Sequence, residues 1–137
     1  MKRTASCCCG ALSVTTEGEP TRISVCHCRA CQYATGGPPN YVALAMKPSF
    51  SVTKGEAKVH TSKADSGADV GRAFCADCGT PLYTIPAEGT PFYPVKLGAL
   101  DDPSGFAPNL HLYMEDAQPW HLTHEGLPQF ARMPPVG

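Results

Sequence analysis

Seven of the eight cysteines fall into three short clusters, and their spacing constrains the fold more than any other feature of the chain. The clusters are a first pair (CxC), a triplet (CxCxxC) and a second pair (CxxC), formed by Cys7 and Cys9, by Cys26, Cys28 and Cys31, and by Cys75 and Cys78. A structural zinc is held by four protein ligands, whereas a catalytic zinc is held by three and keeps its fourth position open. Seven thiols equal four plus three, so the count predicts one zinc site of each kind.

The spacing alone leaves two pairings of these clusters open. A zinc ribbon would join the CxxC part of the triplet to the second pair, and it would leave the first pair and Cys26 without a role. The other pairing joins the first pair to the second pair across a long stretch of chain and leaves the triplet as an open cluster. Zinc chemistry alone does not choose between these two pairings.

The composition is typical of one globular domain over residues 1–137. Of the 137 residues 42% are hydrophobic and 17% are charged, and the formal net charge is -1 without any block of Lys or Arg. This balance excludes the basic surface that nucleic acid requires. No apolar run reaches the roughly 20 residues of a membrane-spanning helix, and the start lacks the apolar run of a signal peptide. We therefore expect a cytoplasmic protein whose thiols bind metal or do chemistry instead of forming disulfides; nothing indicates an oligomeric state.

Glycine and proline favour a mainly β fold, because together they make up 27 residues (13 and 14) and interrupt long helices. The expected strands are residues 11–16, residues 21–25, "YVALAM", "SFSVT", "GEAKVHTS", "FYPVKLGAL" and "NLHLYM". Residues 62–70 are expected to form a surface loop, and no helix is predicted. The second cysteine pair lies on a tight turn, where Gly79 permits an unusual backbone angle.

Six segments together resemble the glutathione-dependent formaldehyde-activating enzyme family, from about Ser6 to about Pro134. They are "CCCGAL", "CHCRAC", "FCADCGTPLY", "LGALDDP", "PW" and "GLPQF". The resemblance implies a small domain of antiparallel β-sheets in a tent-like arrangement, clipped by a structural zinc. It also implies the second pairing: Cys7, Cys9, Cys75 and Cys78 hold a structural zinc, and Cys26, Cys28 and Cys31 hold a catalytic zinc that is lost more readily.

The resemblance further implies a carbon-sulfur lyase that forms S-(hydroxymethyl)glutathione from glutathione and formaldehyde. Three anionic thiolate ligands weaken a zinc ion as an electrophile, so such a site is better suited to orienting and deprotonating a thiol than to generating hydroxide. Two other classes stay open. One is a non-catalytic zinc-binding module that binds a protein partner, and the other is a thiol redox or zinc sensor.

A closed triplet site is the alternative to an open one, with a fourth ligand supplied by His27, His60, His111 or Cys8. His27 lies between two ligands, so in an extended strand its side chain points to the opposite face and packs or supports the site instead. The two carboxylates of glutathione require a cation. Arg72 is the predicted binding residue, and Arg22 and Arg29 also lie near cysteine clusters in the sequence.

Several other residues carry weaker expectations. Cys8 occupies a spacer position of the first motif, as a spare thiol or a competing ligand, and Gln32 and Tyr33 stand where basic residues are common in the family. The pair Asp101 and Asp102 is expected to begin a turn before Pro103 instead of forming an acid site. The aromatic residues of the C-terminal segment are expected to pack it against the sheets; they are Trp120 and Phe130.

Overall fold

The structure is a computed structural model that describes residues 2–134, and the chain divides into two compact units. Unit 1 comprises Met1–Thr21 and Ala43–Gly105, and unit 2 comprises Arg22–Val42 and Phe106–Gly137. Strand β4 (Asn40–Met46) passes from unit 2 into unit 1. The predicted single domain over residues 1–137 stays a prediction, as does its tent-like arrangement.

The first sheet of unit 1 has three antiparallel strands in the order β1-β2-β5. These are β1 (Lys2–Ser6), β2 (Ser13–Glu17) and β5 (Phe50–Lys54). Strand β2 confirms the strand expected near residues 11–16, but the sequence analysis missed β1. The short connection from β1 to β2 contains the first cysteine pair, and a 3-10 helix, η1 (Lys47–Ser49), leads from β4 into β5.

A second antiparallel group in unit 1 runs in the order β9-β8-β7-β6. Its strands are β6 (Lys58–Lys63), β7 (Asp69–Phe74), β8 (Pro81–Ile85) and β9 (Phe92–Lys96), followed by the 3-10 helix η2 (Leu97–Ala99). Strands β6 and β7 pair from Lys58 with Phe74 to Lys63 with Asp69, so the loop predicted over 62–70 is only the short hairpin turn between these strands. The connection from β7 to β8 contains the second cysteine pair.

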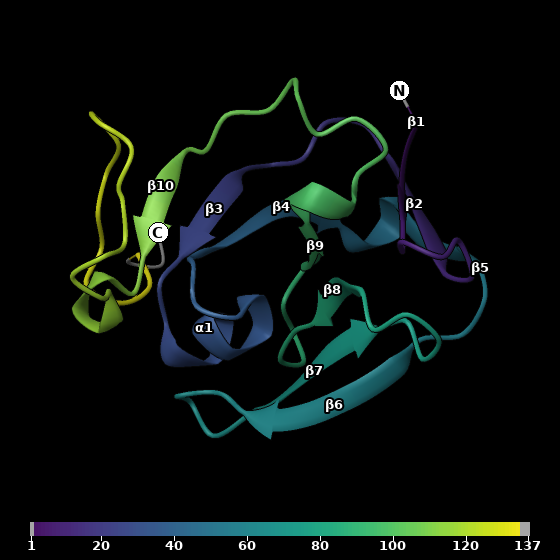
Figure 1. Cartoon of the computed structure of the whole chain (residues 1–137), viewed down its shortest axis with the longest axis horizontal. Coiled ribbons are helices and arrows are strands. Elements are labelled where there is room, and N and C mark those ends of the chain that lie inside the picture. The colour runs from purple at the N-terminus through teal and green to yellow at the C-terminus, as the bar shows by residue number, and fades with distance from the viewer. Residues whose placement is uncertain (1, 135–137) are drawn as a thin grey trace. The chain divides into compact units, whose positions relative to one another are not determined.

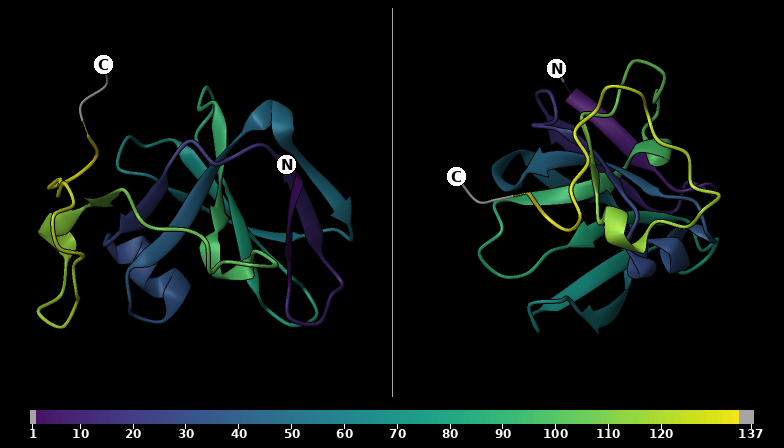
Figure 2. Two further views of the ribbon diagram at one scale, coloured as in Figure 1. Left: turned by 90° about the horizontal axis from the view of Figure 1, so that it is seen from above. Right: turned by 90° about the vertical axis from the view of Figure 1, so that its left-hand side faces the viewer.

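Unit 2 is built around two parallel strands, β3 (Ile23–Cys26) and β10 (Leu110–Leu112), which lie side by side in Figure 1. The C-terminal segment, yellow in Figure 2, runs alongside β10. A backbone hydrogen bond joins the two: the amide of Phe130 donates to the carbonyl oxygen of His111 at 3.0 Å. A 3-10 helix, η3 (Met114–Asp116), follows β10.

Unit 2 also contains the α-helix α1 (Arg29–Thr35), which the sequence analysis did not predict. It is seven residues long, which is too short for a clear helical period in the sequence. Its ends are defined locally: the Cys28 sulfur accepts a hydrogen bond from the Cys31 amide at the start, and Gly36 adopts a left-handed backbone with φ 83° at the end. The mainly β fold with antiparallel sheets is confirmed, and no helix within residues 2–134 is long and apolar enough to cross a membrane.

Candidate metal centres

The first and second cysteine pairs come together in unit 1. The sulfur atoms of the four residues all lie within 4.8 Å of one another, and we call them the four-cysteine group: Cys7, Cys9, Cys75 and Cys78. The Cys9 sulfur lies 3.7 Å from the sulfur of Cys7 and 3.7 Å from that of Cys75. Four sulfurs placed tetrahedrally at about 2.3 Å from a zinc ion are about 3.8 Å apart, so these separations fit a zinc site.

Two similar backbone turns present these sulfurs. After β1 the Cys7 sulfur accepts a hydrogen bond from the Leu12 amide at 3.2 Å. After β7 the Cys75 sulfur accepts one from the Cys78 amide at 3.5 Å, and Gly79 has the left-handed φ of 79° that the sequence analysis expected. Because backbone amides aimed at sulfur favour the thiolate form, both turns are suited to holding a cation.

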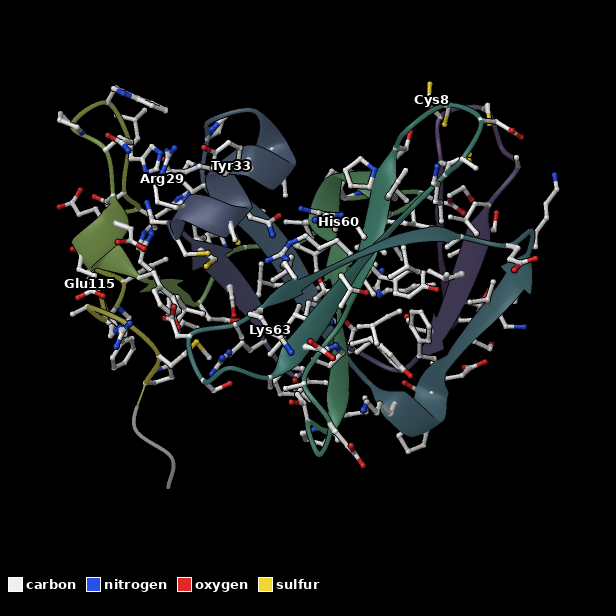
Figure 3. All side chains as sticks on the ribbon, turned by 90° about the horizontal axis from the view of Figure 1, so that it is seen from below. Cys8, Arg29, Tyr33, His60, Lys63 and Glu115 are labelled. Atoms are coloured by element: carbon white, nitrogen blue, oxygen red, sulfur yellow. The ribbon has the colours of Figure 1, made fainter. Side chains whose placement is uncertain are left out.

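Thr80 adds a side-chain donor to the four-cysteine group. Its hydroxyl oxygen accepts the Cys8 amide hydrogen at 3.1 Å and lies 3.2 Å from the Cys78 sulfur, to which it can direct its own proton. The hydrogen bond from Thr80 lowers the pKa of the Cys78 thiol to about 5. The Cys8 side chain itself is exposed and projects outward in Figure 3, and its sulfur is not among the four.

The triplet forms a second group, in unit 2. Its three sulfurs also lie within 4.8 Å of one another, and we call it the three-cysteine group: Cys26, Cys28 and Cys31. Cys26 ends β3, Cys28 caps α1, and Cys31 is buried in the first turn of this helix. Cys28 keeps an extended backbone, with φ -63° and ψ 157°, and the helix begins at the next residue. The helix brings Cys31 back to the other two sulfurs.

Hydrogen-bond donors and neighbouring thiols shape the electrostatics of the three-cysteine group. The Cys31 amide donates to the Cys28 sulfur at 3.3 Å, and the side-chain amide of Asn40 donates to the Cys31 sulfur at 3.5 Å. The neighbouring thiols of Cys28 and Cys31 raise the pKa of Cys26. Three thiolates this close repel one another unless a cation lies among them. Three soft sulfur donors with amide hydrogen bonds fit a zinc ion that keeps an open position.

His27 is not part of the three-cysteine group, as the sequence analysis expected, although it lies between two of its members. Its side chain is fully buried, and its ring contacts the rings of His111 and His121, with nitrogen-to-nitrogen distances of 2.9 Å in both cases. Burial, followed by the two neighbouring histidines, lowers the pKa of His27 to about 4. Both His27 and His111 are therefore occupied by other partners within unit 2, and the group found there contains three ligands.

The candidate arginines have local partners in the structure. Arg72, on β7, donates to the Ser62 hydroxyl at 3.0 Å, and Arg22 donates to the Ser24 hydroxyl at 3.1 Å. Arg29 lies on α1, where its guanidinium stacks over the Tyr33 ring at 5.0 Å, and both residues are labelled in Figure 3. The assignment of Arg72 to substrate binding stays a prediction.

Gln32 has a structural role that the sequence analysis missed. Its side chain is 3% exposed, and its amide nitrogen donates to the carbonyl oxygens of His27 at 2.8 Å and Asp116 at 3.0 Å. Its amide oxygen accepts from Gln118 at 3.1 Å. This residue therefore does not face a substrate, whereas its neighbour Tyr33 is 80% exposed.

Of the remaining expectations, the turn at Asp102 is confirmed and the packing of Trp120 is wrong. The Asp102 carboxylate accepts hydrogen bonds from the amide and the hydroxyl of Ser104, which confirms the turn, and the Ser104 hydroxyl lowers the pKa of this carboxyl group. The expectation that Trp120 packs the C-terminal segment against the sheets is wrong, because this side chain is 60% exposed. Its ring instead forms a T-shaped contact with the His121 ring, with the ring centroids 4.7 Å apart. The sequence analysis did not identify three residues that contact the cysteine groups or the buried His27, because none of them lies in a recognisable motif: Asn40, Thr80 and His121.

Comparison with known proteins identifies the family of this chain. The family model described as "Glutathione-dependent formaldehyde-activating enzyme" matches residues 2–116, which is most of the chain. The chain belongs to this family. The match confirms the resemblance drawn from the cysteine motifs, and the structure brings together the cysteine pairs that the family resemblance implied.

Two further similarities accompany the family match. An uncharacterised lyase of Schizosaccharomyces pombe is 31% identical over 78 residues, which cover 57% of this chain and 53% of the relative, so the match spans about half of that protein. A crystal structure of a Rhodobacter sphaeroides protein has a TM-score of 0.58 at 20% identity and covers 77% of this chain and 91% of that one. The second similarity concerns the fold alone.

Proposed function

We propose that this chain is a zinc-dependent carbon-sulfur lyase that acts reversibly on the adduct of a thiol and an aldehyde. The observation that carries the proposal is the difference between the two cysteine groups: one has four sulfur donors and the other has three. A group with three donors leaves one coordination position for a substrate. The family description supports glutathione as the thiol and formaldehyde as the aldehyde.

Each group has its own role in this proposal. A zinc ion held by Cys26, Cys28 and Cys31 would supply a Lewis acid that favours the thiolate form of a substrate thiol at neutral pH. The chain contributes hydrogen bonds to this site, because the Cys31 and Asn40 nitrogens donate to two of the three sulfurs. The four-cysteine group would hold the structural zinc of unit 1.

The proposed reaction balances without an oxidant or a reductant. In the synthetic direction the glutathione sulfur forms a bond to the carbonyl carbon of formaldehyde, and the electron pair of the carbonyl π bond moves to oxygen. The thiol proton ends on that oxygen, which gives S-(hydroxymethyl)glutathione. The reverse direction breaks the carbon-sulfur bond and releases both substrates, which is lyase chemistry. The reducing cytoplasm, where glutathione keeps its thiol, is the compartment that suits this reaction.

Exchange NMR tests the proposal directly. Glutathione and 13C-labelled formaldehyde exchange with their adduct without a catalyst, so the measured quantity is the exchange rate with and without the zinc-loaded chain. We expect the chain to increase this rate and Cys28→Ser to return it to the uncatalysed value. A wild-type chain that carries two zinc ions per molecule and leaves the rate unchanged would contradict the proposal and favour a non-catalytic zinc module.

A second thiol that lacks carboxylates tests the identity of the substrate independently of the type of reaction. If the chain accelerates exchange with glutathione but not with 2-mercaptoethanol, glutathione recognition is supported. Equal acceleration with both thiols would retain the lyase and remove glutathione as its specific substrate. Formation of a disulfide within the three-cysteine group under mild oxidation, with no exchange activity, would favour the redox sensor.

A further inference from the structure

Three histidine rings from separate segments form a hydrogen-bonded chain in unit 2. The Nδ1 atom of His121 lies 2.9 Å from Nδ1 of His27, and Nε2 of His27 lies 2.9 Å from Nδ1 of His111. Backbone groups terminate both ends: His121 Nε2 lies 3.0 Å from the Gly37 carbonyl oxygen, and His111 Nε2 lies 3.0 Å from the His124 amide nitrogen. The rings of His27 and His111 have no exposed surface.

The two ends determine where every ring proton lies. A carbonyl oxygen only accepts, so Nε2 of His121 carries a proton, and a backbone amide only donates, so Nε2 of His111 carries none. A neutral imidazole has one donor and one acceptor. His111 therefore donates from Nδ1 to His27, and His27 donates from Nδ1 to His121. The Gln118 amide, 3.3 Å from Nδ1 of His121, agrees with an acceptor at that atom.

No other neutral arrangement satisfies the chain. Moving the proton of a single ring brings two lone pairs or two N–H groups face to face at 2.9 Å. Moving all three protons together places a lone pair against the Gly37 carbonyl oxygen and an N–H group against the His124 amide. Because backbone groups terminate the chain, it offers no path for a proton to leave. Its geometry suits holding a segment in place, not relaying protons.

The segment that this chain holds lies within the three-cysteine group. His27 separates Cys26 from Cys28, and its backbone groups are also bonded: its amide donates to the Leu112 carbonyl at 2.9 Å, and its carbonyl accepts from Gln32 at 2.8 Å. Every polar group of His27 therefore has a partner. The peptide between the two sulfur-bearing residues has little freedom to rearrange.

We infer that His27, His111 and His121 are positioning residues that hold Cys26 and Cys28 in the geometry in which the three-cysteine group binds metal. The inference rests on the metal-holding role in the proposed function, but not on the reaction performed there. A site that is already arranged binds its metal more tightly than one that must reorganise, and changes to the groups around metal ligands commonly alter affinity about 10-fold to 100-fold.

The first test is the proton arrangement itself. Long-range 1H-15N correlation spectra of the 15N-histidine-labelled, zinc-loaded chain at pH 7 distinguish the two neutral forms of each ring. We expect the Nδ1–H form for His27 and His111 and the Nε2–H form for His121. Any other assignment, including a rapidly exchanging mixture at any of the three rings, would overturn the inference.

The second test is a titration of the full chain with cobalt(II). Thiolate-to-metal absorption monitors binding, and the two cysteine groups are measured as separate phases. His111→Leu removes the donor to His27 Nε2, and we expect the three-cysteine phase to weaken at least about tenfold. His111→Asn retains a side-chain N–H donor and should stay within about threefold of the wild type. The matched control is His124→Gln, which removes a neighbouring imidazole but keeps the backbone amide of the chain.

The four-cysteine phase reports the folding of unit 1 in the same titration. Wild-type affinity and spectrum for His111→Leu would overturn the inference, and so would equal losses for His111→Leu and His111→Asn, since equal losses indicate packing alone. A wild-type chain that binds cobalt at both groups but does not accelerate thiol-aldehyde exchange would remove the proposed reaction. In that case the cobalt and NMR results would still decide the positioning role.

Discussion

At the scale of single residues, His111 is a buried histidine that stays neutral in the folded chain. Burial, followed by the nearby His124, lowers its pKa from the ordinary value of 6.5. In the unfolded chain the same ring gains a proton near pH 6.5. Between the two pKa values the unfolded state therefore binds more protons, so stability rises with pH and is lost as the pH falls below about 6.5.

This linkage predicts a stability difference that depends on pH. The loss on acidification reaches at most about 1.4 kcal/mol per pH unit for this histidine, and His111→Asn should lose less stability than the wild type between pH 7 and 5. Urea unfolding of both proteins at several pH values measures it. Protonation of the metal-binding thiols affects the two proteins alike and cancels in the comparison. Equal slopes for both proteins would contradict the prediction.

Arg72 carries the other prediction at this scale. If its guanidinium binds a carboxylate of glutathione, Arg72→Ala should raise KM about tenfold or more, because charge-assisted hydrogen bonds contribute about 1.5–3 kcal/mol. The melting temperature should change little, since the lost hydrogen bond to Ser62 is a single polar contact. Steady-state kinetics with glutathione measure the effect, and Arg22→Ala serves as the control. An unchanged KM removes Arg72 from substrate binding.

At the scale of elements, helix α1 depends on one buried amide. The side chain of Gln32 donates to the carbonyl oxygens of His27 and Asp116, so it ties α1 to the ends of β3 and η3. Gln32→Glu keeps the shape but places a carboxylate against two carbonyl oxygens. We expect it to destabilise the chain by about 2–3 kcal/mol at neutral pH. Chemical denaturation measures the change.

The neighbouring position on the same helix supplies the control for Gln32. Tyr33 is 80% exposed, so Tyr33→Phe should change the free energy of unfolding by less than about 0.5 kcal/mol. If Gln32→Glu were as mild as Tyr33→Phe, the hydrogen bonds of the Gln32 amide would not stabilise α1.

At the scale of the whole molecule, the two cysteine groups separate stability from chemistry. The four-cysteine group joins the β1–β2 connection to the β7–β8 connection within unit 1. Zinc bound at such a closed site contributes directly to the free energy of folding. Cys75→Ser is therefore expected to lose one zinc and to unfold or lose most of its cooperative melting transition. Zinc counting and circular dichroism check both effects, and a variant with unchanged melting would exclude a structural zinc there.

The companion variant is Cys28→Ser, which alters the three-cysteine group. It should stay folded, keep the zinc of the four-cysteine group, lose the second zinc and show no thiol-aldehyde exchange. A zinc ribbon would instead make Cys28 a structural ligand together with Cys75, so the two variants would collapse alike. Side-by-side melts and zinc counts decide between these outcomes, and equal collapse would contradict the catalytic role of the three-cysteine group.

The sequence predicted the mainly β fold, most strands and the two cysteine groups, because the patterns behind these predictions lie among residues that are close together in the chain. Glycine and proline limited the helices, alternating residues predicted most strands, and the turn at Gly79 followed from its backbone freedom. The count of seven clustered thiols indicated two metal sites of different kinds. The family motifs, which are also local, indicated which pairs belong together and which enzyme family the chain joins.

The rest depended on tertiary structure, because it rests on contacts between residues far apart in the chain. Helix α1 is too short to show a period, and the buried Gln32 that anchors it resembles a surface residue in the sequence. The chain of His27, His111 and His121 spans separations of 84 and 94 residues, which no local pattern reveals. Ring orientation and proton position follow from the groups at both ends of that chain, so only the folded arrangement decides them.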